Sequence, residues 1–232
     1  RHTIWKGADP APLVDAFAEV PALYIADGHH RCKAASRAAE EFRSHESHTP
    51  DAPEYAFFPA VVFPMSHMKV LAYNRVVFDL PEMPAAFRDT LANRFDVAPT
   101  DDPVPSEKGT VCVYIDGDWY RMALPEGTGA KAVDALDVAR LSEHLLEPLL
   151  DITDPRRDPT IDFVGGIRGT DELERRVDDG DADMAISMYP TSIEELVAVS
   201  DEGSLMPPKS TWFEPKLRSG MLVHDFADDV PA

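Results

Sequence analysis

Residues 111–124 carry a β-hairpin pattern that restricts the folds open to this chain. Two apolar runs with alternating side chains, VCVYI and DWYRMAL, are joined by Asp116-Gly117. Asp-Gly is a pair that type I′ turns prefer, because both central residues of such a turn need positive φ angles. A hairpin makes two neighbouring strands antiparallel, so the pattern excludes a uniformly parallel sheet.

The rest of the chain alternates between helical and extended patterns. Apolar residues at helical spacing predict helices, and short apolar runs bounded by turn residues predict strands. We expect helices over residues 10–20, 31–42, 84–95, 131–150 and 171–180, another that begins at Thr191 or Ser192, and strands over 22–26, 54–63, 70–80, 160–164 and 183–189. Because hairpins and helices are interspersed, the sequence predicts an α+β fold with a mixed β-sheet and flanking helices.

Charge and composition narrow the class of protein. The chain carries 42 Asp and Glu residues against 22 Lys and Arg, a formal net charge of -20, which argues against a nucleic-acid partner. No apolar run approaches the roughly 18 residues that span a membrane, and the first residues, RHTIWKGADP, lack the apolar core of a signal peptide. Cys32 and Cys112 show no CxxC spacing, so we expect a reducing, cytoplasmic location without a membrane partner.

The pentapeptide Asp27-Gly28-His29-His30-Arg31 stands where a short apolar run meets an alanine-rich helix. A helix N-terminus is the positive end of the helix dipole, and acidic side chains are favoured there. Basic residues reverse that preference, at a cost of about 0.3–1 kcal/mol for each positive charge. A bound anion would offset the cost, because the helix start offers N–H donors and an arginine fork can hold two phosphate oxygens. The sequence therefore predicts an anion site that favours nucleotide phosphate.

Asp27 has two compatible interpretations. Its side chain can cap the helix N-terminus, or it can bind Mg²⁺, which takes one or two carboxylates together with phosphate oxygens. Zinc is disfavoured, because the side chains of His29 and His30 diverge by about 100° on a helix. His45 and His48 lie in a proline-bearing loop, where we expect them to be solvated.

A second group of candidates lies in MPPKSTWFEPKLRSG. Lys209 and Arg218 add positive charge to a very acidic chain, and Ser210 and Thr211 add hydroxyl groups. A lysine beside hydroxyl residues can contact a phosphate or a substrate carboxylate. A rigid surface segment anchored by buried aromatic residues is an equally good interpretation.

Two further pairs attract weaker hypotheses. In DFVGGIRG, the turn at Gly165 and Gly166 can form a small anion nest, and Arg168 can clamp a carboxylate. The alternative is a tight bend with Arg168 paired to a nearby acid, and for Arg168 we favour this alternative slightly. Asn74 and Arg75, between two apolar strand segments, form a weaker candidate pair.

Four blocks, LYIADGHHR, YNRVV, IDFVGGIRG and MPPKSTWFEPKLRSG, resemble the family catalogued as domain of unknown function 1015 (DUF1015). The resemblance covers nearly the whole chain and implies one α+β domain of that type over residues 1–232, with a sub-boundary allowed near residues 100–108. Members of that family are typically longer at the N-terminus. We therefore expect this chain to be the C-terminal portion of a longer protein.

The block DGHHR also resembles the phosphate-binding strand-turn-helix of the ParB/sulfiredoxin-like superfamily, in the two-histidine form of the free L-serine kinases. The resemblance implies that Asp27 holds Mg²⁺. It also implies that Gly28, His29, His30 and Arg31 bind the polyphosphate of ATP or ADP. No carboxylate that precedes the motif matches the catalytic base of those kinases.

We therefore expect a small-molecule kinase that transfers phosphate to a free amino acid such as L-serine, with nucleotide and small-molecule partners and a homodimer allowed. Two alternatives stay open, a non-catalytic nucleotide-binding switch that is ParB-like without DNA binding, and a phosphohydrolase. The candidate residues are Asp27, His30 and Lys209 for catalysis and Arg168, Ser210, Thr211 and Arg218 for substrate binding.

Overall fold

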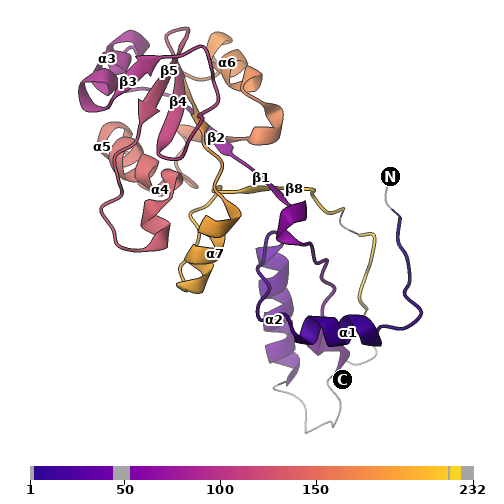
Figure 1. The fold of residues 1–232 in the computed structure, drawn as a ribbon. Helices are drawn as coiled ribbons and strands as arrows, with labels where there is room; N and C mark the ends of the chain where they lie inside the picture. The colour runs from indigo at the N-terminus through magenta and orange to yellow at the C-terminus, as the bar shows by residue number, and fades with distance from the viewer. Residues whose placement is uncertain (1–2, 44–52, 219, 226–232) are drawn as a thin grey trace. The chain divides into compact units, whose positions relative to one another are not determined.

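The computed structural model describes residues 3–43, 53–218 and 220–225. The chain divides into two compact units, a smaller one from residues 1–59 and 222–232 and a larger one over residues 60–221 (Figure 1). Residues 100–108 lie inside the larger unit. That residues 1–232 form one domain stays a prediction. Within the described residues, no helix has the length and apolar character needed to cross a membrane.

The smaller unit contains two helices, α1 (Ala11–Ala18) and α2 (His29–Arg43), and a 3-10 turn, η1 (Glu54–Ala56). Both helices confirm the sequence prediction, and Pro12 lies in the first turn of α1, where its missing N–H costs nothing. The aromatic rings of Phe42 and Tyr55 pack with their centroids 5.4 Å apart, which brings α2 against η1. Tyr55 is buried.

The strands predicted over residues 22–26 and 54–63 are wrong. Residues 22–26 are irregular, with Leu23 and Ile25 exposed by 62% and 47%. Residues 54–56 form η1, and residues 57–63 are irregular. An apolar run becomes a strand only when a neighbouring strand completes its hydrogen-bond ladder, and none of the described strands pairs with either segment.

The larger unit is built on a six-stranded sheet in the order β3-β5-β4-β7-β2-β6. Every strand pair in the described chain is antiparallel, so the α+β class is confirmed and the expectation of a mixed sheet is wrong. Asp116 and Gly117 have φ angles of 56° and 84°, which confirms the hairpin turn. The strands are β2 (Tyr73–Val77), β3 (Val97–Pro99), β4 (Thr110–Ile115), β5 (Asp118–Ala123), β6 (Ile161–Gly165) and β7 (Met184–Met188).

Helices cover both faces of this sheet (Figure 1). One face packs against α3, the segment from η3 to α5, and α7, while the other packs against α6 through Leu173. Because both faces are covered, every residue of β4 and β7 is buried. The helices are α3 (Pro84–Arg94), η3 (Ala132–Ala135), α4 (Asp137–Leu141), the π-helix η4 (Ser142–Leu146), α5 (Glu147–Leu150), α6 (Asp171–Asp178) and α7 (Ile193–Asp201).

A two-stranded sheet holds the C-terminal block in place. β1 (Lys69–Leu71) pairs antiparallel with β8 (Trp212–Glu214), so the predicted strand over residues 70–80 is divided into β1 and β2. The ring of Trp212 meets that of Tyr73 edge-on, with the centroids 5.4 Å apart. The block MPPKSTWFEPKLRSG therefore packs beside the start of β2.

Candidate functional site

The predicted anion site begins where α2 begins. Gly28 has a φ of +86°, a left-handed conformation that glycine adopts without strain, and its carbonyl accepts the first helical hydrogen bond from Cys32 N at 2.9 Å. No acidic residue lies in the first turn of α2. The structure thus confirms that His29, His30 and Arg31 open the helix, although an irregular segment rather than a strand precedes them.

The guanidinium of Arg31 folds back over this glycine turn. A Cβ placed on Gly28 would lie 3.1 Å from Arg31 Nη2 and 3.3 Å from Nε, a separation tighter than ordinary contacts. Glycine permits the positive φ, whereas the exposed end of the arginine could shift to accommodate a Cβ. Asp27, His29, His30 and Arg31 are all exposed.

The carboxylate of Asp27 also contacts the glycine turn. Its Oδ1 accepts a hydrogen bond from Gly28 N at 2.7 Å. A single carboxylate at this turn fits Mg²⁺ only together with phosphate oxygens, since the described residues hold no group of three or more His, Cys, Asp and Glu that could bind a metal ion by themselves. His45 and His48 lie outside the described residues.

The C-terminal candidates differ in their surroundings. Ser210 is buried and donates from Oγ to Pro207 O at 2.6 Å, so its hydroxyl closes a local turn. Lys209 is exposed, has a φ of 57°, and places Nζ 5.2 Å from the centre of the Tyr73 ring. Thr211 is half-buried and Arg218 is exposed.

The turn at Gly165 and Gly166 is shaped by packing. A Cβ on Gly165 would lie 2.6 Å from the ring of Trp212, so only glycine fits there. Gly166 N donates to Ala72 O at 2.8 Å and is not available to an anion. Arg168 is exposed and lies 3.5 Å from a carboxylate oxygen of Glu172, the pairing that the sequence analysis favoured.

Asn74 and Arg75, a weak candidate pair in the sequence, both occupy distinctive positions in the structure. Both residues are buried, and Asn74 Oδ1 accepts a hydrogen bond from Met188 N at 3.0 Å, which joins β2 to β7. Arg75 lines a cleft of about 620 Å³ in the larger unit. Sequence reasoning missed the rest of this cleft, because its lining comes from segments that are far apart in the chain, including residues 133–147, 153–156, 163 and 207–208.

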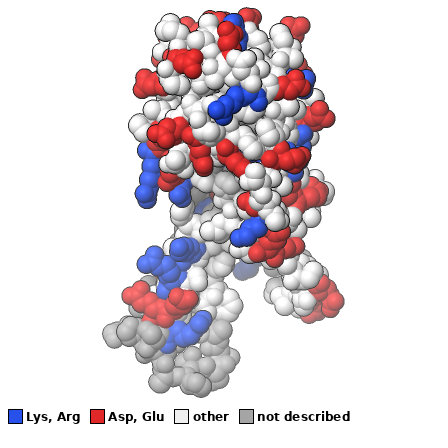
Figure 2. Space-filling view, turned by 90° about the vertical axis from the view of Figure 1, so that its left-hand side faces the viewer, with Lys and Arg blue, Asp and Glu red and all other residues white. Residues whose placement is uncertain are grey.

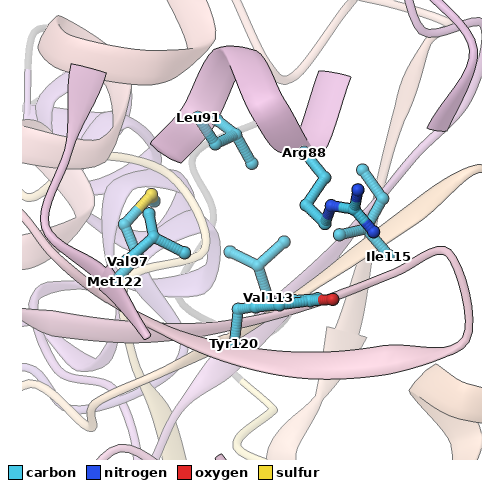
Figure 3. A pocket seen from close by; sticks show the side chains of 7 residues that line it. All are labelled: Arg88, Leu91, Val97, Val113, Ile115, Tyr120 and Met122. Carbon is cyan, nitrogen blue, oxygen red and sulfur yellow. The ribbon is translucent and has the colours of Figure 1, made fainter. Parts of the chain in front are cut away.

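A second hollow, beneath α3, carries no chemistry. It is lined by Arg88 and by six residues of the core and its edge, drawn in Figure 3, and it has no room for a water molecule. Figure 2 shows Asp and Glu side chains scattered over one face of the molecule with Lys and Arg interspersed, so charge alone does not mark a site on that face.

A family model matches residues 1–139 of the chain, more than half of its length, and its description is "Protein of unknown function (DUF1015)". The chain belongs to the DUF1015 family. This confirms the family resemblance. Of the four sequence blocks, LYIADGHHR and YNRVV lie within the matched residues, and the other two lie beyond them. No curated protein matches this DUF1015 chain.

Solved structures with a similar arrangement include free serine kinases. One, in complex with AMP, is 14% identical, with a TM-score of 0.38 over 63% of this chain and 54% of the kinase. Another, in complex with ADP, is 16% identical, with a TM-score of 0.43 over 84% of this chain and 70% of that chain. A conserved hypothetical protein from Pyrococcus furiosus is 14% identical, with a TM-score of 0.44 over 84% and 72% of the two chains. This DUF1015 chain thus spans about half the length of the AMP-bound kinase.

Proposed function

We propose that this chain binds nucleotide phosphate at residues 27–31 and belongs to a kinase that phosphorylates the hydroxyl group of a free amino acid such as L-serine. The observation that supports the proposal most directly is the start of α2. There a left-handed glycine leads into three basic or potentially basic residues, and no acidic residue lies in the first turn. An anion is the natural partner of such a helix end.

Each residue of the turn has a chemical task in this proposal. The main-chain N–H groups at the start of α2 and the guanidinium of Arg31 donate to phosphate oxygens, and His29 and His30 donate from their ring nitrogens. Asp27 would hold Mg²⁺. Bound with the nucleotide, Mg²⁺ would neutralise charge on the phosphates, which phosphoryl transfer requires more than covalent chemistry.

On the acceptor side we propose Lys209 and Thr211 before the other C-terminal candidates. Lys209 is exposed and Thr211 is half-buried, so each can reach a small molecule. Ser210 and Arg168 already hold structural partners, Pro207 O and Glu172 respectively, and for these two a substrate role would require the partner to be exchanged. Arg218 is exposed and stays a candidate.

Calorimetry with ADP and Mg²⁺ tests the binding half of the proposal. ADP is a fitting first probe because it is a ligand of one of the free serine kinases above. We expect Arg31→Ala to weaken ADP binding about tenfold or more, since a charge-assisted hydrogen bond contributes about 1.5–3 kcal/mol. Arg37→Ala, an exposed arginine farther along α2, is the matched control and should bind as the unaltered protein does.

A coupled assay with ATP or ADP, Mg²⁺ and L-serine tests the catalytic half. Formation of phosphoserine that is lost in Asp27→Ala would support a kinase. Nucleotide binding without turnover would instead favour a switch, and phosphate released to water without an acceptor would favour a phosphohydrolase. If calorimetry detects no nucleotide or phosphate binding, the whole proposal fails.

A further inference from the structure

The cleft of about 620 Å³ in the larger unit is lined by a buried arginine that has no carboxylate partner among the described residues. Arg75, on β2, is 4% exposed and lines the cleft. Its guanidinium donates to two main-chain carbonyls, Tyr73 O through Nη1 and Lys209 O through Nη2 at 3.4 Å. It also lies 5.4 Å from the centre of the Phe163 ring. Among the described residues, no carboxylate lies within 4.0 Å of it.

This arrangement is costly without a partner. Removing a charged side chain from water costs several kcal/mol unless another charge compensates. Burial lowers the pKa of Arg75 to about 10, so the side chain still carries its positive charge at neutral pH. Two carbonyl oxygens satisfy only part of the five N–H donors of a guanidinium. The remaining N–H donors and the positive charge of Arg75 would be satisfied by a bound anion.

An irregular helical segment also lines the cleft. The π-helix Ser142–Leu146 contributes Ser142, Glu143 and Leu146 to the lining. Single π-helical turns are rare and occur frequently at functional sites, because the wider turn displaces side chains from regular helical positions. The cleft is thus lined both by a buried cation, Arg75, and by a π-helical turn.

The acidic residues of the cleft limit the kind of anion that fits. Glu143 accepts hydrogen bonds from Thr128, which lowers its pKa, and Asp154 pairs with Arg156, whose Nε lies 3.0 Å from Asp154 Oδ1. Asp134 and Glu147 also line the cleft. Asp134 Oδ2 accepts a hydrogen bond from Lys131 N at 3.0 Å, and Glu147 has no ion pair among the described residues. These carboxylates would repel a doubly charged phosphate more strongly than a singly charged carboxylate.

We propose that this cleft binds a small organic carboxylate, with the carboxylate group on Arg75 and the apolar part of the ligand against Leu146 and Phe163. In a ligand that also bears an ammonium group, Glu147 receives the positive charge. The arginine fork matches a carboxylate in two parallel hydrogen bonds. Because every lining residue belongs to the larger unit, the site is independent of the nucleotide proposal at residues 27–31.

Thermal unfolding in the presence of three probes tests this site, since a ligand that binds the folded state raises Tm. The probes are propionate, L-alanine and inorganic phosphate. We expect propionate and L-alanine to raise Tm in a saturable manner by binding in the cleft. Any rise in Tm caused by phosphate should come from residues 27–31, so Arg31→Ala should weaken it and Thr153→Trp should leave it unchanged. Arg75→Lys keeps the charge but loses the fork, and it should weaken binding of both carboxylates at least tenfold.

Two further variants keep the test decisive if Arg75→Lys fails to fold. Thr153 is exposed and lines the cleft, so Thr153→Trp should block both carboxylates by filling it. Glu147→Gln should weaken L-alanine several-fold and leave propionate unchanged, while Glu194→Gln, another exposed glutamate in a first helical turn, should alter neither.

Three outcomes would overturn the proposal. The first is no saturable effect of either carboxylate, and the second is carboxylate binding that Thr153→Trp leaves unchanged. The third is phosphate binding that Arg31→Ala leaves unchanged and Thr153→Trp abolishes, which would make the cleft a phosphate site. Arg31→Ala should leave carboxylate binding intact, so failure here and failure of the nucleotide proposal are distinguishable.

Discussion

The two compact units bury their apolar residues very differently. In the smaller unit, neither α1 nor α2 contains a buried residue, and Leu13 on α1 is 62% exposed. In the larger unit, β4 and β7 are buried at every position. The DGHHR motif therefore lies in the unit whose helices bury the least. Motif specificity and packing density are separate properties of a chain.

Arginine shows the same contrast. Arg31 is exposed at a helix start, where solvent screens its charge and the unfavourable dipole costs little. Arg75 is buried between strands, where its charge is expensive. Each is a candidate anion ligand. Arg31 is suggested by a positive charge at a helix N-terminus, which the sequence shows, and Arg75 by a buried charge, which only the tertiary structure shows.

The largest loss of stability should come from replacing a leucine with alanine, once in each unit. Leu145→Ala, at a position with no exposure, should lower the free energy of unfolding by about 2–5 kcal/mol, because it leaves a cavity. Leu13→Ala should cost less than about 1 kcal/mol. Urea denaturation monitored by hydrogen exchange, which reports each unit separately, measures both. Equal losses of unfolding free energy in the two variants would contradict the difference in burial between the units.

The two cysteines give the next effect, since each unit has one and both are free. Cys112 is buried, and burial together with the charge of Asp102 raises its thiol pKa to about 11. Cys32 is half-buried on α2. We expect iodoacetamide at pH 8 to label Cys32 at least tenfold faster, because the thiolate is the reactive form. Single-cysteine variants followed by mass spectrometry give the rates, and similar rates would contradict the expectation.

A smaller effect concerns the start of α2. Arg31→Glu replaces an unfavourable charge with a favourable one and should stabilise the first turn by about 0.3–1 kcal/mol or more, while abolishing nucleotide binding. Hydrogen exchange of the α2 amides measures the first result and calorimetry the second. Arg37→Glu, away from the helix end, is the control. A loss of protection in Arg31→Glu would show that the arginine holds the turn together.

The smallest effect is a pH dependence at the surface of the larger unit. Hydrogen bonds from Arg175 and then Arg176 lower the pKa of Glu172 from 4.5 to about 2. A carboxyl group with a depressed folded pKa stabilises the protein above its unfolded pKa, and this stability is lost as the pH falls toward about 2. The Tm difference between the unaltered protein and Glu172→Gln should therefore shrink from pH 5 to pH 2. A constant difference would show that the ion pairs contribute nothing.

Much of the larger unit could be predicted because its signals are local. The Asp116-Gly117 turn depends on two φ angles. The start of α7 depends on Ser192, whose Oγ accepts from Glu195 N at 3.1 Å, with the Glu195 carboxylate accepting from Ser192 N in return. Such interactions span three or four residues, so their residue types suffice to identify them.

Only the part of the candidate site at the start of α2 could be predicted from the sequence. The start of α2 at His29 and the glycine turn before it follow from residue type and order. The partner of Ser210, the burial of Arg75 and the cleft around it do not, because those contacts join β2, the helical segment from η3 to α5, and the residues before β8. No local pattern encodes contacts between such distant segments.

Residue types in their local order were enough to predict the starts of α3, α6 and α7, the Asp116-Gly117 hairpin and the DUF1015 family. Which apolar runs became strands, and that the described sheet is antiparallel throughout, depended on tertiary contacts. So did the place of Arg75, which lines a cleft with no carboxylate within 4.0 Å among the described residues. The physical reason is that turns and caps are satisfied by neighbouring residues, whereas ladders, burial and charge compensation are satisfied only by whatever part of the chain folds against them.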